Sequence, residues 1–114
     1  MLEEAKLALR VTEVAYDPEI ASLLSAGAKD LEAAGVMLPG TVSFAYGNGA
    51  VTDNSTLTDE LVQRALITYA RMNFGSPPDY DKVFASYELQ KSTLMHSSSY
   101  TEYDDSGVIA DAES

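Results

Sequence analysis

The sequence predicts an all-α fold: a small four-helix bundle with an irregular loop or short β-hairpin between the second and third helices, and an extended C-terminal tail. Three observations lead to this prediction. Apolar side chains recur at helical spacing in four separate segments. Glycine and proline mark the boundaries between these segments. Residues 96–114 differ from the rest, because they carry five acidic side chains and no lysine or arginine.

A chain of 114 residues fits a single domain. We expect residues 1–95 to form the helical bundle domain, with the loop or hairpin at residues 36–57, and residues 96–114 to form an acidic C-terminal tail. Such a tail is expected to be disordered in isolation. The chain has 18 acidic and 7 basic residues and a formal net charge of -11, which disfavours binding to nucleic acid phosphates.

The first two helices are predicted from spacing and from boundary residues. Leucine and alanine at helical spacing predict a short helix over residues 2–10. Asp17 followed by Pro18 marks the next helix start, because the carboxylate can cap free backbone N–H groups and proline needs no N–H there. The second helix is expected to end near residue 34, before Gly35.

One glycine falls inside the apolar stripe of the second helix. The stripe comprises Ile20, Leu24, Gly27, Leu31 and Ala34. A glycine inside a helix costs roughly 1 kcal/mol relative to alanine. We therefore expect close approach of another backbone at Gly27, rather than a ligand-binding role.

Residues 36–57 break the helical rhythm. Val42, Phe44 and Tyr46 alternate with small or polar residues, and Asn48-Gly49 favours the positive backbone angles of a tight hairpin turn. A short hairpin or an ordered loop is predicted. A phosphate-binding loop is disfavoured, because the segment lacks the Lys-Ser/Thr pair of a P-loop.

The third helix is expected to begin at Thr58, whose hydroxyl can cap it, and to end near Phe74, before Gly75. Asp59 and Glu60 occupy its first turn, where the helix dipole favours negative charge.

A second stripe on this helix mixes charged and large apolar side chains. Its members are Glu60, Arg64, Ile67, Arg71 and Phe74. The stripe is either an ordinary solvated face or a subunit contact. Pro77-Pro78 prevents continuation of the helix, and Asp79 starts a fourth one. The apolar side of that fourth helix is predicted to carry Tyr80, Val83, Phe84, Tyr87 and Leu94.

The sequence gives little support for catalysis. His96 is the single histidine, and a position near a chain end suits a solvated side chain better than a Ser-His-Asp site. One histidine and no cysteine exclude the usual zinc patterns. We expect no enzyme activity, no metal and no cofactor. No apolar run approaches the roughly 20 residues of a membrane helix, so we expect a soluble protein without a membrane partner.

Tyrosine suits contacts that are wet at one end. Tyr87, Tyr100 and Tyr103 are therefore candidate anchors for a partner, and Tyr87 is equally well explained as a core residue.

Four stretches carry a resemblance to a known family. They are LEEAKLALRV, DPEIASLLSAGAKDLEAAGV, DELVQRALITYARMNFG and DYDKVFASYELQKSTLMHSSSYT. Together they cover most of residues 2–101, and the sharpest part is Tyr87-Glu88-Leu89-Gln90-Lys91 with the later Ser-Ser-Tyr-Thr. The chain resembles the head-tail connector (adaptor) proteins of long-tailed double-stranded DNA bacteriophages and prophages.

This resemblance implies a structural virion protein that forms a ring of about 12 copies below the portal protein. Such a ring joins capsid to tail, also contacts further neck or tail-completion proteins, and lets DNA pass during packaging and ejection without sequence-specific binding. The protein would reside at the head-tail interface, and in the host cytoplasm during assembly. The residues implied to face neighbouring subunits are Glu60, Arg64, Ile67, Arg71, Phe44 and Tyr46. Those implied to face the portal are Leu94, Met95, Tyr100 and Tyr103.

Two rival functions remain open at the sequence level. An acidic DNA mimic that inhibits a DNA-binding protein would also be small, negative and free of cysteine. A small hydrolase would depend on His96.

Overall fold

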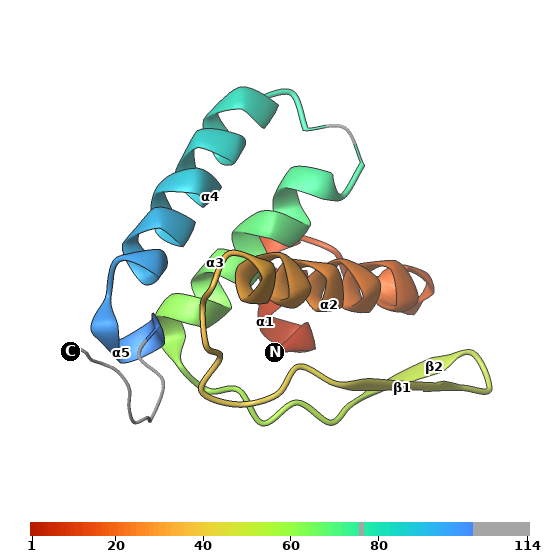
Figure 1. The fold of residues 1–114 in the computed structure, drawn as a ribbon. Helices are drawn as coiled ribbons and strands as arrows, with labels where there is room; N and C mark the ends of the chain where they lie inside the picture. The colour runs from red at the N-terminus through yellow and green to blue at the C-terminus, as the bar shows by residue number, and fades with distance from the viewer. Residues whose placement is uncertain (76, 102–114) are drawn as a thin grey trace.

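The computed structural model describes residues 1–75 and 77–101 (Figure 1). In chain order the elements are α1 (Leu2–Leu9), the 3-10 helix η1 (Val14–Tyr16), α2 (Asp17–Ala33), β1 (Phe44–Gly47), β2 (Ala50–Asp53), α3 (Glu60–Asn73), α4 (Tyr80–Met95) and α5 (Ser98–Thr101). Helix α3 is central, because α1, α2 and α4 all pack against it. Its N-terminal end lies close to α5 (Figure 1).

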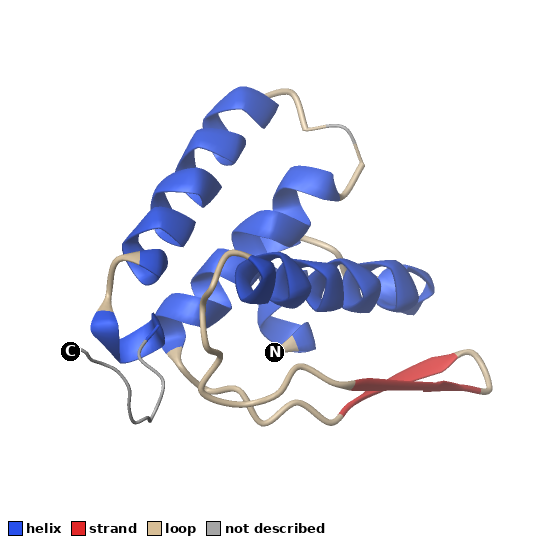
Figure 2. Ribbon diagram, in the orientation of Figure 1, coloured by secondary structure: helices blue, strands red, loops and turns tan. Residues whose placement is uncertain are grey.

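The predicted all-α class is wrong. The described residues contain a two-stranded antiparallel sheet beside the helices, so the fold is mixed α and β (Figure 2). The four predicted helices correspond to α1, α2, α3 and α4. Of the two alternatives for residues 36–57, the hairpin is the one that forms. Its turn works because Asn48 and Gly49 have φ of 52° and 76°, the two positive angles that a two-residue hairpin turn needs.

The hairpin runs beside α2 as a narrow arm, and its tip reaches beyond that helix (Figure 2). Its register pairs Phe44 with Asp53 and Gly47 with Ala50. Hydroxyl groups continue the pairing toward the helices: the Thr41 N–H donates to Thr56 Oγ1 at 2.8 Å, and the Ser43 N–H donates to Ser55 Oγ at 3.0 Å. These bonds anchor an arm whose side chains are mostly exposed.

The core lies between α2, α3 and α4, with contributions from α1 and the loops. Its largest fully buried side chains are Tyr87, Ile20, Leu24, Leu31, Leu66, Leu94 and Val62. The rings of Tyr69 and Tyr87 meet edge to face with centroids 5.4 Å apart. Tyr80 and Phe84, predicted on the apolar side of the fourth helix, are instead 42% and 43% exposed and stack on each other.

The close approach predicted at Gly27 involves a side chain, not a backbone. A Cβ at Gly27 would lie 3.1 Å from the Tyr69 ring and 3.2 Å from Leu66 Cδ2. A backbone approach occurs instead at Gly40, where a Cβ would lie 2.8 Å from the Cα of Leu57. Gly40 has a φ of 153°, so it also needs the conformational freedom of glycine.

Two predicted helix caps are replaced by other interactions. Helix α2 begins at Asp17-Pro18 as predicted, but no side chain caps it. Asp17 instead forms a buried ion pair with Lys6, whose Nζ lies 2.8 Å from Asp17 Oδ1. This pair joins α2 to α1. At the start of α3 the cap is Asp59 rather than Thr58, because Asp59 Oδ1 accepts the Val62 N–H at 3.0 Å.

The predicted extended tail is also wrong for its described part. Residues Ser98–Thr101 form α5, which packs against the end of α4. The Met37 N–H donates to the carbonyl of Tyr100, so this short helix also contacts the loop after α2. Residues 102–114 of the predicted tail lie outside the described residues.

Candidate interaction surfaces

The charged stripe predicted on α3 is present at the surface. Glu60, Arg64 and Arg71 are exposed, and Ile67 is half-buried against the core. Between α1 and α3 a shallow hollow is lined by Glu4, Glu60, Gln63, Arg64, Ile67 and Thr68. The stripe therefore combines exposed charged groups with a partly buried apolar side chain.

The charged residues of this stripe differ in their partners. Arg71 Nη2 lies 3.1 Å from Asp79 Oδ2, in an exposed ion pair that links α3 to the start of α4. Arg64 makes no ion pair with any described residue. Arg64 is thus the more available cation for a partner, since Arg71 would have to exchange one carboxylate for another.

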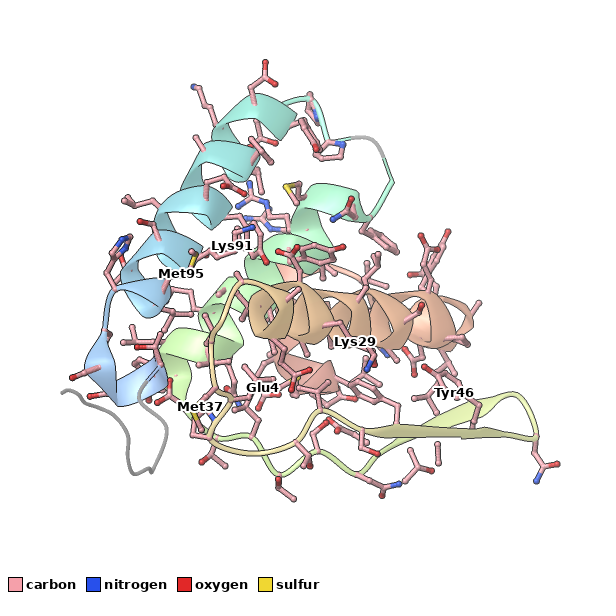
Figure 3. All side chains as sticks on the ribbon, in the orientation of Figure 1. Glu4, Lys29, Met37, Tyr46, Lys91 and Met95 are labelled. Carbon is pink, nitrogen blue, oxygen red and sulfur yellow. The ribbon has the colours of Figure 1, made fainter. Side chains whose placement is uncertain are left out.

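Phe44 and Tyr46, the other two predicted subunit contacts, lie on β1 and point to the same side of the hairpin. Phe44 is half-buried and packs against the core, whereas Tyr46 is 57% exposed. Figure 3 labels Tyr46 on the hairpin. Both line a hollow of about 440 Å³ between the hairpin and α2. This hollow shares no lining residue with the hollow beside the α3 stripe. The structure therefore places the six predicted subunit contacts on two separate surfaces.

The four predicted portal contacts occupy different environments. Leu94 is 2% exposed and belongs to the core, so almost none of its side chain is accessible to a portal. Met95 is 38% exposed at the end of α4 (Figure 3). Tyr100 is half-buried, and its hydroxyl is bound within the chain. Tyr103 lies outside the described residues. Met95 is therefore the described member of this set that is most accessible.

Asp59 connects the start of α3 to α5, a role that the sequence interpretation missed. Besides capping α3, it accepts a hydrogen bond from the Tyr100 hydroxyl at 2.7 Å through Oδ2. The Val62 N–H is the main cause that lowers the pKa of Asp59, and the Tyr100 hydroxyl adds to it. The same bond to Asp59 raises the pKa of Tyr100. The available signal was that aspartate is a better helix cap than threonine.

A second polar cluster joins α2 to α4. The buried Tyr87 hydroxyl donates to Asp30 Oδ2, and Lys91 Nζ lies 3.2 Å from the same oxygen. The Lys91 ammonium also lies 5.3 Å from the centre of the Tyr87 ring. Burial is the main cause that raises the pKa of Tyr87, and Asp30 adds to it. Of its two interpretations, the structure assigns Tyr87 to the core.

An apolar groove between α3 and α4 was not predicted. It holds about 200 Å³ and is lined by Leu61, Arg64, Leu89, Gln90, Thr93 and Leu94. Leu61 and Leu89 are 50% and 70% exposed. We call it the α3–α4 groove. Sequence spacing gave no signal for it, because it depends on how the two helices cross.

His96 lies at the C-terminal end of α4, where its side chain contacts a backbone carbonyl of the last turn. Its Nδ1 lies 2.7 Å from the carbonyl of Ser92, so Nδ1 carries the proton and donates. The Ser92 hydroxyl lies 3.4 Å from the same nitrogen. Within residues 1–75 and 77–101, no group of three or more His, Cys, Asp or Glu side chains is placed to hold a metal ion.

No protein-family model, curated protein or solved structure matches this chain. Among the helices of the described part, none has the length and apolar character needed to cross a membrane.

Proposed function

We propose that this protein is a head-tail connector (adaptor): a structural, non-enzymatic virion protein that forms a ring below the portal and extends the DNA channel. The proposal rests on the sequence resemblance over residues 2–101. The structural observation that best supports it is that the residues expected to contact neighbouring subunits lie on two separate surfaces of one small chain.

A closed ring requires such a pair of surfaces. Each subunit in a cyclic ring contacts one neighbour with one patch and the other neighbour with a different patch. The α3 stripe offers Glu60 and Arg64, which are exposed charges beside the half-buried Ile67. The hairpin offers Tyr46, a large amphipathic side chain that is 57% exposed. We assign these two surfaces to the two sides of the ring contact.

The hairpin itself favours a partner. A two-stranded hairpin is marginally stable in water without other support, and the tip of this one projects beyond α2 (Figure 2). A neighbouring subunit that packs on Tyr46 would add the burial that the arm lacks.

The overall charge is compatible with a DNA channel. Each phosphate bound by lysine or arginine adds salt-sensitive affinity, which would hinder sliding. A chain with a net charge of -11 presents little such affinity.

Electron microscopy of the protein mixed with its cognate portal tests the proposal. The expected result is an added ring layer on the portal. Absence of that layer, or binding as isolated subunits, would contradict the connector function. Removal of residues 102–114 should weaken portal binding, and unchanged binding would remove this segment from the portal contact.

Two variants test the pairing of surfaces. Glu60→Arg alters the stripe and Tyr46→Ser alters the hairpin, so each alone should prevent ring closure. Mixed in equal amounts, each variant retains the surface that the other lacks, and the mixture should give pairs instead of rings. Tyr80→Ser, which removes an exposed tyrosine on α4, is the matched control and should leave rings intact.

The acidic net charge is equally compatible with an alternative function, a DNA mimic that inhibits a DNA-binding protein. That function predicts a monomer or dimer that binds a basic protein with an affinity that falls steeply as salt increases. Ring formation on a portal at moderate salt distinguishes the two functions.

A further inference from the structure

The surface of the α3–α4 groove is mostly apolar. Its walls include Leu61 and Leu89, both at least half exposed, and Leu94 contributes buried apolar surface. Two large exposed leucines beside one groove are typical of a surface that is covered by another segment.

Two polar groups in the groove indicate which chemical groups a bound segment should contain. Arg64 has no ion-pair partner among the described residues, so it would attract a carboxylate. Gln90 Oε1 is buried and accepts no hydrogen bond from any part of the chain that the structure describes. A buried acceptor without a donor is costly, and a backbone N–H of an occupant could supply the donor.

The chain's own C-terminal segment begins beside this groove. Tyr100 is fixed to Asp59 by the 2.7 Å hydrogen bond, and Asp59 lies two residues before the groove residue Leu61. Thr101, the last described residue, is therefore held near the start of α3. Residues 102–114 can span roughly 40 Å when extended. The helix α4, with its 16 residues, is only about 24 Å long, so the segment can reach any point of the groove.

The composition of residues 102–114 matches the groove. Val108 and Ile109 provide adjacent apolar side chains. Acidic residues flank them on both sides, and the segment has no lysine or arginine. Val108 is seven residues beyond Thr101, within roughly 25 Å when extended.

We propose that residues 102–114 bind in the α3–α4 groove of the same chain, with Val108 and Ile109 against Leu61 and Leu89 and a carboxylate beside Arg64. The contact concerns the isolated chain, so its test does not depend on the connector proposal. One consequence rests on the connector proposal: the bound segment would cover Arg64 in the free subunit and would have to leave before a neighbour could use that residue.

A spin label tests this contact directly. The chain contains no cysteine, so Ser106→Cys accepts a single nitroxide without other changes. In NMR spectra of the labelled, isotope-enriched chain, the amide signals of Leu61 and Leu89 should broaden more strongly than in the same labelled chain carrying Ile109→Asp, because Thr101 holds the label near α3 in both chains. Signals of the hairpin tip, at Asn48, should broaden far less. Equal broadening of the groove amides and the Asn48 amide would overturn the proposal.

A mixing experiment distinguishes binding within one chain from binding to a second copy of the chain. Labelled chain without isotope enrichment is mixed with enriched chain that carries no label. Binding within one chain predicts no broadening of Leu61 or Leu89 in this mixture. Broadening that grows with protein concentration would show that the segment binds a neighbouring copy, and would overturn the proposal.

Substitutions at the groove supply the matched comparison. Arg64→Glu replaces attraction by repulsion and should reduce the bound-to-free ratio by roughly fivefold. Ile109→Asp should reduce the broadening of Leu61 and Leu89 to the level that tethering at Thr101 alone produces. Lys82→Glu makes the same charge change on an exposed lysine at the other end of α4 and should leave it unchanged. If Arg64→Glu and Lys82→Glu behave alike, the groove is not the binding site.

Discussion

Tyr100 donates a hydrogen bond to Asp59 across 41 residues of sequence, with 2.7 Å between the two oxygen atoms. The same carboxylate caps α3 through the Val62 N–H. One acidic side chain thus fixes both the start of the central helix and the position of α5. The element expected to belong to a free tail is therefore tied to the body.

Tyr100→Phe should loosen α5. Phenylalanine keeps the apolar contact but loses the hydrogen bond to a partly exposed carboxylate, so we expect the free energy of unfolding to fall by about 1 kcal/mol. The Met37 amide donates to the Tyr100 carbonyl, and its hydrogen exchange should become faster. Urea unfolding and amide exchange measure both effects. Tyr80→Phe, at an exposed position, is the control, and an equal loss in both variants would contradict this role.

Stability should decline when acid protonates Asp53. Burial alone would raise the pKa of this carboxyl, but hydrogen bonds from the Leu2 and Ser55 amides, the Ser55 side chain and the Met1 ammonium lower it to about 2. A lowered pKa in the folded state stabilises above the unfolded value of 3.8 and loses that contribution as pH falls toward 2. After screening by solvent we expect a loss of about 1 kcal/mol.

Urea midpoints measured from pH 6 to pH 2 check this expectation. Asp53→Asn should flatten the decline between pH 4 and pH 2 relative to the unmodified chain, since it removes the titrating group. Asp81→Asn removes the same charge at an exposed position on α4 and should leave the slope unchanged. Parallel curves for all three proteins would show that Asp53 is not responsible.

Tyr87→Phe should destabilise the packing of α4 on α2. The Tyr87 side chain is 2% exposed, and its hydroxyl is the buried donor to Asp30. Its removal leaves that carboxylate with Lys91 as the remaining partner, and a hydrogen bond to a charged group contributes about 1.5–3 kcal/mol. Urea unfolding of Tyr87→Phe beside Tyr46→Phe gives the comparison, because Tyr46 is exposed. A loss below that of the control would contradict the importance of the cluster.

Gly40→Ala should be among the most damaging single-methyl changes. The new Cβ would meet the Leu57 Cα at 2.8 Å, and a φ of 153° is strained for alanine. We expect a loss of about 2–3 kcal/mol, measured by thermal or urea unfolding. Gly47→Ala is the matched control, since a Cβ there has no atom within 4 Å. Similar stabilities for the two variants would show that the loop relaxes around Gly40.

The interpretation of Gly27 shows where sequence reasoning reached its limit. The apolar stripe and the cost of glycine in a helix indicated a close approach, but the prediction that another backbone makes it was wrong. The sequence could not say that the neighbour is the Tyr69 ring, because that depends on how α2 and α3 cross. Leu94 had two expectations: helical spacing placed it on the apolar side of the fourth helix, and the resemblance implied a portal contact. The structure agrees with the first, because Leu94 is 2% exposed.

The sequence by itself determined the local elements: the helix start at Asp17-Pro18, the turn at Asn48-Gly49 and the four main helices. These depend on backbone preferences and on side chains a few residues apart, which are the same in any context. Only the tertiary structure decided that Asp59 holds Tyr100, that Asp30 holds Tyr87 and that a groove opens beside Leu61. Each of these depends on how segments distant in sequence pack together. The spacing of residues within one segment carries no information about which other segment it contacts.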